Sequence, residues 1–202
     1  MASFTSQVEA IAGDSSDYTT FIPIWLNEAA RHIVDYTVES GYRGSLLCTQ
    51  QVGPFSSTSG YELTDNAGVL RVWSDGITCV PINPLQFEEA DRSGSMYERG
   101  PEDPAFIVKN GKIYVAGGHA SLNYADIAVY GTIDDSAGTI DNFPKALYTC
   151  VVMYTAYKLL STKSRELIEG EEDIELAASL GGHAKVMYET YMNTLGMYLG
   201  RK

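Results

Sequence analysis

One segment, DNFPKALYTCVVMYTAYKLL at residues 141–160, constrains the fold more than any other part of the chain. Asp141 or Asn142 is a suitable N-cap and Pro144 suits a first turn, so the segment predicts a helix that begins at Asp141. Aliphatic and aromatic side chains occur on nearly every side of that helix, and one small core cannot bury them all. The helix must therefore be surrounded, either by other elements of the chain or by other molecules.

Two further helices are predicted near the N-terminus. A short apolar segment around Val8 and Ile11 ends at Gly13, which indicates one or two helical turns. Apolar residues then recur at helical spacing in FIPIWLNEAARHIVDYTVES, residues 21–40, with Gly41 just after the end. We predict a long amphipathic helix there.

The C-terminal third predicts two helices separated by a break between Ser161 and Gly170. The last helix opens on the acidic residues 171–173, where the helix dipole favours negative charge. Gly181 and Gly182 inside it should weaken or bend the helix unless another backbone packs closely there.

The middle of the chain, from Ser45 to about Tyr130, predicts strands. Asp75-Gly76 and Asn110-Gly111 each lie between alternating apolar and polar residues, which is the pattern of a β-hairpin. A third run at residues 121–131 can pair onto the second hairpin. The polar stretch from Phe87 to Pro104 predicts a long exposed loop.

The expected fold class is therefore α+β, a helical bundle formed by the N- and C-terminal helices with a β-rich insertion. The expected boundaries are residues 1–42 for the first helices, 43–131 for the insertion and 132–202 for the helices that complete the bundle.

Charge and composition exclude several classes of protein. A net charge of -12 and no cluster of Lys or Arg argue against a nucleic-acid binder. The N-terminal residues do not have the pattern of a signal peptide, and no apolar run is long enough to predict a membrane span. Cys48, Cys79 and Cys150 are far apart, so we expect reduced core residues in a cytosolic setting.

Motifs for catalysis or metal binding are absent from the sequence. GxSxG, HExxH, GxGxxG and a P-loop do not occur, and His32, His119 and His183 each suit a structural or exposed position. TIDDSAGTID, residues 132–141, predicts a turn before an N-cap rather than a calcium loop. The acidic pairs at 88–89 and 102–103 are expected to be solvated. No catalytic residue, cofactor or metal is predicted.

Aromatic residues leave two interpretations open. Tyrosines of the last two helices are either core residues or part of a surface used against another subunit: Tyr148, Tyr154, Tyr157, Tyr188 and Tyr198. Trp73 in the insertion is either a core residue or, with nearby tyrosines, a stacking platform for carbohydrate. A small acidic hydrolase with its site in the β-rich region is the other alternative, and converging buried carboxylates would favour it.

Four features occur together in one order: FIPIWLNEAARHIVD, the β-rich centre with NGKIYV, the helix IDNFPKALYTCVVMYTAYKLL and an acidic start to a last helix. This combination resembles the head-to-tail connector proteins of tailed bacteriophages, the adaptor or head-completion proteins found below the portal. The loop from Phe87 to Pro104 and the double glycine depart from that pattern.

The resemblance implies a non-enzymatic structural protein of the virion neck, made in the host cytoplasm. It implies a homo-oligomeric ring of about twelve copies, docked on the portal protein and carrying the tail or a second adaptor protein. DNA would pass through the channel without specific binding, past acidic residues that include some of Glu88, Glu89, Glu102 and Asp103.

A ring also offers one explanation for a helix that is apolar on several sides, since the neighbouring copy would cover part of it. The alternative is a helix that is central in a monomeric bundle. We expect the C-terminal end to dock on the portal or on an adjacent subunit. The candidate interface residues are Tyr154, Tyr157, Tyr188, Tyr191, Leu195 and Tyr198.

Overall fold

A computed structural model describes residues 2–40, 48–63, 68–170 and 173–200. The chain divides into a helical unit, residues 1–48 with 130–202, and a β unit, residues 49–129. Helices from both ends of the chain flank a β-rich middle, so the fold is α+β as predicted.

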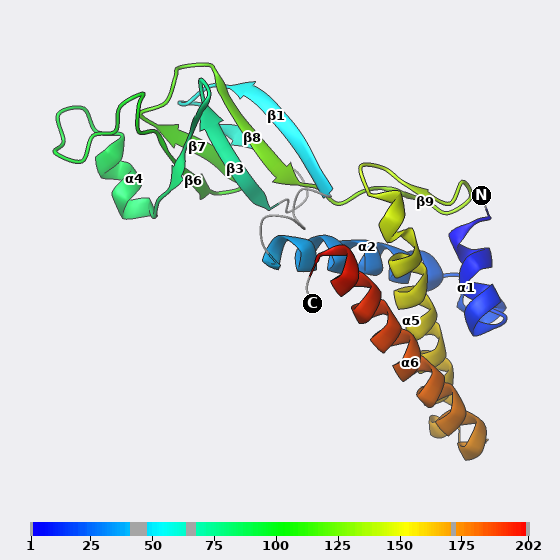
Figure 1. Cartoon of the computed structure of the whole chain (residues 1–202). Helices are drawn as coiled ribbons and strands as arrows, with labels where there is room; N and C mark the ends of the chain where they lie inside the picture. The colour runs from blue at the N-terminus through cyan, green and yellow to red at the C-terminus, as the bar shows by residue number, and fades with distance from the viewer. Residues whose placement is uncertain (1, 41–47, 64–67, 171–172, 201–202) are drawn as a thin grey trace. The chain divides into compact units, whose positions relative to one another are not determined.

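The apolar segment lies in the central helix of the helical unit. The helical elements are α1 (Phe4–Ala12), η1 (Ser16–Tyr18), α2 (Ile22–Glu39), η3 (Lys145–Leu147), α5 (Tyr148–Glu169) and α6 (Ile174–Tyr198). Helix α5 packs against α1, α2 and α6, and Figure 1 shows α6 beside it for most of its length. Ten α5 residues are buried as a result: Tyr148, Cys150, Val151, Val152, Tyr154, Thr155, Ala156, Leu159, Leu160 and Ser164. The bundle itself therefore covers most of this helix.

Both predicted ends of this helix are wrong. Asn142 has a positive φ of 52° and Pro144 is extended, so the chain turns before a 3₁₀ segment leads into α5 at Tyr148. The expected break after Ser161 is also absent, because α5 continues to Glu169. Its polar Ser164 is buried against α6, where its Oγ donates to the carbonyl oxygen of Ala177 at 2.7 Å.

The last helix, α6, begins after an acidic N-cap residue, Asp173. The Asp173 side chain accepts a hydrogen bond from the Leu176 amide at 2.8 Å. The expectation for Glu171 and Glu172 lies outside the described residues. Helix α6 runs unbroken through its glycine pair. A Cβ on Gly181 would come within 3.3 Å of the Ser164 Oγ, whereas a Cβ on Gly182 would meet nothing within 4 Å. Close packing thus occurs at the first glycine and not at the second.

The segment TIDDSAGTID forms a small hairpin, β9 (Ile133–Asp134) with β10 (Thr139–Ile140). Asp135 in its turn reaches the start of α1, where its carboxylate accepts hydrogen bonds from the Thr5 amide and the Thr5 hydroxyl, both at 2.8 Å. Helix α1 ends at Gly13, as predicted from the sequence. The hairpin therefore fixes the N-terminal helix to the C-terminal third of the chain.

The β unit contains two four-stranded sheets. The first has the order β1 (Thr49–Phe55), β8 (Asn123–Ala128), β3 (Val69–Ser74) and β4 (Ile77–Thr78). The second has the order β2 (Tyr61–Glu62), β7 (Lys112–Ala116), β6 (Ala105–Lys109) and β5 (Val80–Pro81). Pairing is antiparallel except between β5 and β6. Side chains from both sheets form one core: Val52, Phe55, Val72, Cys79, Ile113, Val115, Ala125 and Ile127.

Both predicted hairpins are present, at Asp75-Gly76 and at Asn110-Gly111, and all four of these turn residues have positive φ. The pairing predicted for the third run is wrong, because β8 lies between β1 and β3 in the other sheet. The Asn123 side chain explains this placement. Its amide nitrogen donates to the carbonyl oxygens of Phe55 and His119, which ties the start of β8 to the end of β1.

The predicted loop from Phe87 to Pro104 is partly helical. Helix α4 (Pro84–Ala90) covers its first residues, and a capping box between Asn83 and Gln86 starts the helix. Turns with mostly exposed side chains follow up to residue 103. The sequence does contain a signal for the start of this helix, namely Asn83 followed by Pro84, with Gln86 three residues after Asn83. That signal was overlooked.

Two further expectations concern thiols and membranes. The three cysteines are buried and unpaired, and burial raises the pKa of Cys48 to about 12 and of Cys79 and Cys150 to about 11. Among the described residues, no helix combines the length and the apolar character needed to cross a membrane.

Candidate functional site

The six candidate interface residues all lie in the helical unit, but they differ in exposure. Tyr154, Tyr191 and Leu195 are buried inside the bundle, with Tyr191 and Leu195 fully covered. Tyr157 is half-buried. Tyr188 is 37% exposed and Tyr198 is 48% exposed, so these two side chains are the candidates that reach solvent most. Tyr148, the remaining tyrosine considered, is buried as well.

Four of these tyrosines form one aromatic cluster between α5 and α6. The ring centroids are 5.3 Å apart for Tyr154 and Tyr191, 5.0 Å for Tyr157 and Tyr188, and 5.9 Å for Tyr188 and Tyr191. His32 of α2 stacks on Tyr154 at 5.4 Å. The cluster therefore joins three helices and extends from the core at Tyr191 to the surface at Tyr188.

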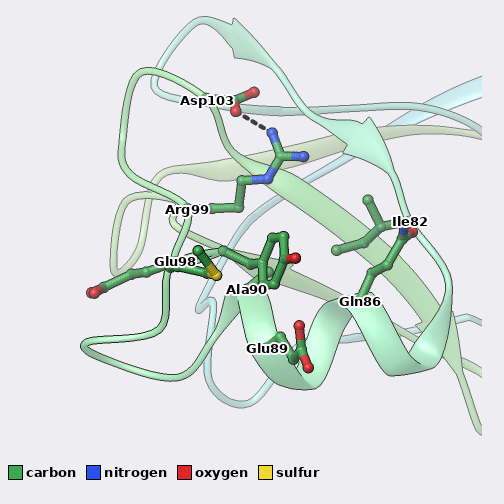
Figure 2. Close-up of a pocket in the computed structure, with 9 residues that line it drawn as sticks. Ile82, Gln86, Glu89, Ala90, Glu98, Arg99 and Asp103 are labelled. Carbon is green, nitrogen blue, oxygen red and sulfur yellow. Dashed lines mark hydrogen bonds and ion pairs between the residues drawn. The ribbon is translucent and has the colours of Figure 1, made fainter.

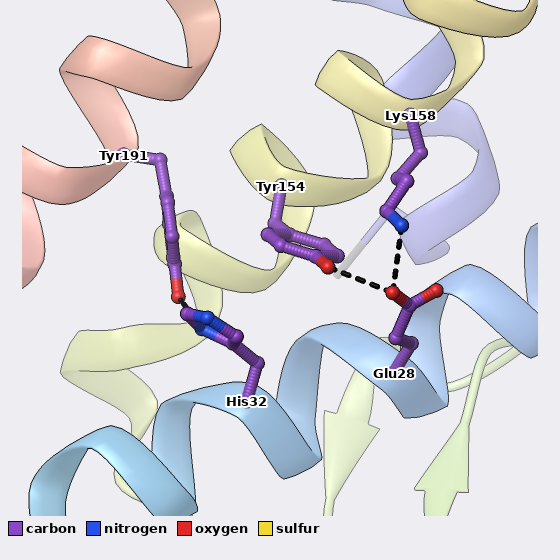
Figure 3. A network of polar contacts seen from close by, with 5 residues as sticks. All are labelled: Glu28, His32, Tyr154, Lys158 and Tyr191. Carbon is purple, nitrogen blue, oxygen red and sulfur yellow. Dashed lines mark hydrogen bonds and ion pairs between the residues drawn. The ribbon is translucent and has the colours of Figure 1, made fainter.

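A polar network lies against the buried end of the cluster (Figure 3). The Tyr191 hydroxyl is 2.6 Å from His32 Nδ1. The Tyr154 hydroxyl donates to Glu28 Oε1 at 2.8 Å, and the Lys158 ammonium donates to the same oxygen at 2.7 Å. The network thus connects α2 to both C-terminal helices through polar groups.

Ionisation in this network follows from burial and pairing. Burial, together with the neighbouring Glu28, raises the pKa of Tyr154. Burial also raises the pKa of Tyr191. Burial alone would raise the pKa of Glu28, but the hydrogen bonds and charge of Lys158 and Tyr154 outweigh it, so that pKa is lowered. At neutral pH the network holds a carboxylate, an ammonium and two neutral phenols, which suits structure rather than proton transfer.

Two surface hollows lie on either side of α5 and share the lining residues Ser161 and Arg165. We call these two hollows together the α5 groove. One, of about 400 Å³, lies between α5 and α6 and is lined by residues that include Ile168, Lys185 and Tyr188. The other, of about 450 Å³, lies between α5 and the start of α2, where Phe21 and Trp25 line it. The groove is a surface depression with aromatic walls.

A hollow of the β unit lies beside α4 (Figure 2). It measures about 660 Å³, and its polar lining includes Gln86, Glu89, Glu98, Arg99 and Asp103. Arg99 forms an ion pair with Asp103. The carboxylates of this hollow belong to exposed residues, so it does not provide the buried converging acids that a hydrolase site of the expected kind would need.

Trp73 is half-buried on the face of β3 that points away from Val72 and the core, so the expectation that it is a core residue is wrong. It stacks on Tyr124 with the rings 5.8 Å apart and 15° from parallel. The Arg71 guanidinium lies 5.2 Å from its ring centroid. Trp73 is therefore one member of an aromatic and cationic stack on the outer surface of the sheet.

The histidines take the structural and exposed positions that the sequence suggested. His119 Nδ1 accepts hydrogen bonds from the Ser121 and Leu122 amides within a turn, and His183 is exposed on α6. Within the described residues, no group of three or more His, Cys, Asp or Glu side chains is arranged to hold a metal ion.

Sequence reasoning missed the pairing of Glu28 with Lys158 and of His32 with Tyr191. Both pairs join residues more than 120 positions apart, and no spacing rule relates them. The groove cations Arg165 and Lys185 were missed for the same reason.

A scan against models of known protein families finds no match to the chain, and a search of curated proteins finds none either.

Proposed function

We propose that the protein is a structural head-to-tail adaptor of a tailed bacteriophage, which assembles as a ring between the portal and the tail. The sequence resemblance suggests this role, and one observation on α6 supports it. Within its own unit α6 buries a narrow seam, Ala177, Ala184, Tyr191 and Leu195, whose members are seven, seven and four residues apart.

Outside this seam, α6 exposes several large apolar side chains among its polar ones. Leu176 is 47% exposed, Val186 is 52% exposed and Met197 is 73% exposed. Large apolar side chains that a helix of 25 residues leaves exposed are candidates for a contact with a second protein. We assign this face, together with Tyr198, to the contact with the portal or an adjacent subunit.

Because Tyr191 and Leu195 are buried, a truncation of the C-terminal end is a poor test of this contact. Removing residues 191–202 would delete Tyr191 and Leu195 from the core, so failure to assemble would not be informative. The sharper variant is Met197→Asp with Tyr198→Asp, since both side chains are exposed. We expect a folded protein that no longer joins particles.

The decisive measurement is the composition of purified particles. We expect the protein at the neck in about a dozen copies, and we expect the double aspartate variant to be missing there while its circular dichroism spectrum is unchanged. A matched control is His183→Asp with Asn193→Asp, which places two aspartates at exposed polar positions of the same helix. Particles that lack the unaltered protein would contradict the proposal.

A carbohydrate-binding module is the second candidate, because Trp73 and Tyr124 stack on the outer face of a sheet. Aromatic faces of this kind also bind sugar rings. Binding to immobilised glycans that Trp73→Ala abolishes would favour this role over the adaptor. A hydrolase would be favoured by turnover of a glycoside, ester, peptide or nucleic acid that one Asp, Glu, His or Ser substitution abolishes.

A further inference from the structure

We infer that the end of the β unit around α4 binds the α5 groove of a second copy of the chain. We call this end the α4 tip and define it as residues 84–103. The inference rests on the proposed ring and names the surfaces that would meet between neighbouring copies.

The α4 tip is both apolar and acidic. Leu85 is 78% exposed, Met96 is 88% exposed and Tyr97 is 61% exposed. The tip contains six acidic and two basic residues, a net charge of -4. One of the two basic residues, Arg99, is already paired with Asp103. Large exposed apolar side chains beside unpaired carboxylates make the tip costly to leave in water and attractive to a basic partner.

The α5 groove has the complementary character. In its hollow between α5 and α6 the charged lining residues are Arg165 and Lys185, and both are basic. The other hollow is lined by two basic residues, Lys158 and Arg165, and one acidic residue, Glu166. Their side chains are 68% and 79% exposed, and their ion pairs with Glu169 and Glu189 are long, at 3.7 Å and 4.0 Å. Ile168 beside them is 57% exposed. Because these exposed ion pairs are weak, Arg165 and Lys185 can form closer ion pairs with acidic residues of another molecule.

Two different surfaces on one chain define a heterologous contact. Each added copy uses one tip and one groove and leaves one of each free, so the assembly grows by addition and forms a ring when the rotation between neighbouring copies closes. The charges fix which surfaces meet, and the apolar side chains supply the buried area. The acidic tip and the basic groove therefore fit a second copy of this chain.

Cross-linking between two single-cysteine variants tests the contact directly. One variant carries Met96→Cys on the tip and the other carries Ser161→Cys in the groove. The native thiols are buried and have raised pKa values, so the new cysteines react first with a short bismaleimide. We expect cross-linked dimers from the mixture and far fewer from either variant alone. A mixture that gives no more cross-linking than the separate variants would overturn the inference.

Charge reversal gives an independent readout. Arg165→Glu with Lys185→Glu should reduce self-association in sedimentation by at least tenfold, and Glu88→Lys with Glu89→Lys should do the same. An equimolar mixture of the two variants should recover part of the lost self-association, because the unaltered tip of one can bind the unaltered groove of the other and the two reversed surfaces are again opposite in charge. The matched control, Arg71→Glu with Lys145→Glu, changes exposed residues outside both surfaces and should assemble normally. Full assembly of the groove variant would overturn the inference.

The same experiments separate this inference from the proposed function. Rings that persist in the charge-reversal variants, without tip-to-groove cross-links, would leave the adaptor role intact and place the interface elsewhere. A chain that is monomeric at every concentration and in particles would contradict both.

Discussion

The Tyr191 hydroxyl lies 2.6 Å from His32 Nδ1 and joins α6 to α2 across the central helix of the bundle. Tyr191 is fully buried. When Nε2 carries the histidine proton, the phenol donates to Nδ1, and its raised pKa keeps that phenol protonated at neutral pH. This contact is one of the direct hydrogen bonds between the N- and C-terminal helices.

The first prediction concerns this link. Tyr191→Phe removes the hydroxyl and should lower the free energy of unfolding by about 1 kcal/mol, because His32 Nδ1 loses its partner. Tyr191→Ala also leaves a cavity and should cost about 3–5 kcal/mol. Urea denaturation followed by far-ultraviolet circular dichroism measures both. Tyr198→Ala, at a 48% exposed position on the same helix, is the control and should change little. Equal losses for the two alanine variants would contradict the placement of Tyr191 in the core.

The second prediction uses the glycine pair of α6. Gly182→Ala enters open space and should stabilise the helix by about 0.5–1 kcal/mol through its higher helix propensity. Gly181→Ala places a methyl group 3.3 Å from the Ser164 Oγ, which already donates to the Ala177 carbonyl. It should therefore be less stable than Gly182→Ala. The difference between their melting temperatures tests the close approach of α5 and α6, and the opposite order would disprove it.

A third prediction concerns pH. The pKa of Glu28 is lowered in the folded protein from its ordinary value of 4.5, so the folded state holds the carboxylate more tightly than the unfolded chain does. The stabilisation is present above pH 4.5 and is lost as the pH falls through the folded pKa. Because the Glu28 side chain is 44% exposed, solvent reduces its contribution to below about 1 kcal/mol.

Comparing the unaltered protein with Glu28→Gln across the acid range tests this. The difference in unfolding free energy should be largest at neutral pH and should shrink below pH 4.5. The exposed Glu102→Gln serves as the control and should show a smaller dependence. A difference that grows towards acid pH would have the wrong sign for this network.

The fourth prediction follows from net charge. About a dozen copies of a chain with charge -12 would present a strongly negative ring to DNA, and such a surface repels the duplex rather than holding it by counterion release. We expect no binding in an anisotropy titration with duplex DNA at low salt, where electrostatic affinity is greatest. Micromolar binding that disappears on adding salt would reveal a basic surface and contradict a channel through which DNA slides.

Local sequence signals predicted much of the fold. Helix α2 and the hairpins at Asp75 and Asn110 depend on periodicity and turn chemistry, which act within a few residues. Helix α4 was missed although its capping box is a local signal. Other failures occurred where distant residues decide: strand β8 pairs with β1 and β3, and its Asn123 donates a hydrogen bond to Phe55, 68 residues earlier.

The candidate site was less accessible to sequence reasoning. The tyrosine pattern left core packing and a subunit interface open, and it could not say that Tyr191 is covered and Tyr188 is not. That difference depends on α2, which reaches Tyr154 and Tyr191 through Glu28 and His32. The sequence of α6 alone does not indicate which of its side chains α2, more than 100 residues earlier in the chain, will bury.

The hydrogen bonds from Thr5 to Asp135 also bear on the order in which the protein folds during synthesis. They join residues 130 positions apart, and α1 and α2 both find their main packing partner in α5, which starts at Tyr148. The β unit, by contrast, is one uninterrupted stretch from residue 49 to residue 129. A ribosome therefore synthesises every strand of that unit before it makes α5, and the unit has all of its own residues while α1 and α2 still lack their packing partner. A free fragment that ends before Tyr148 would hold a folded β unit and two helices without a core.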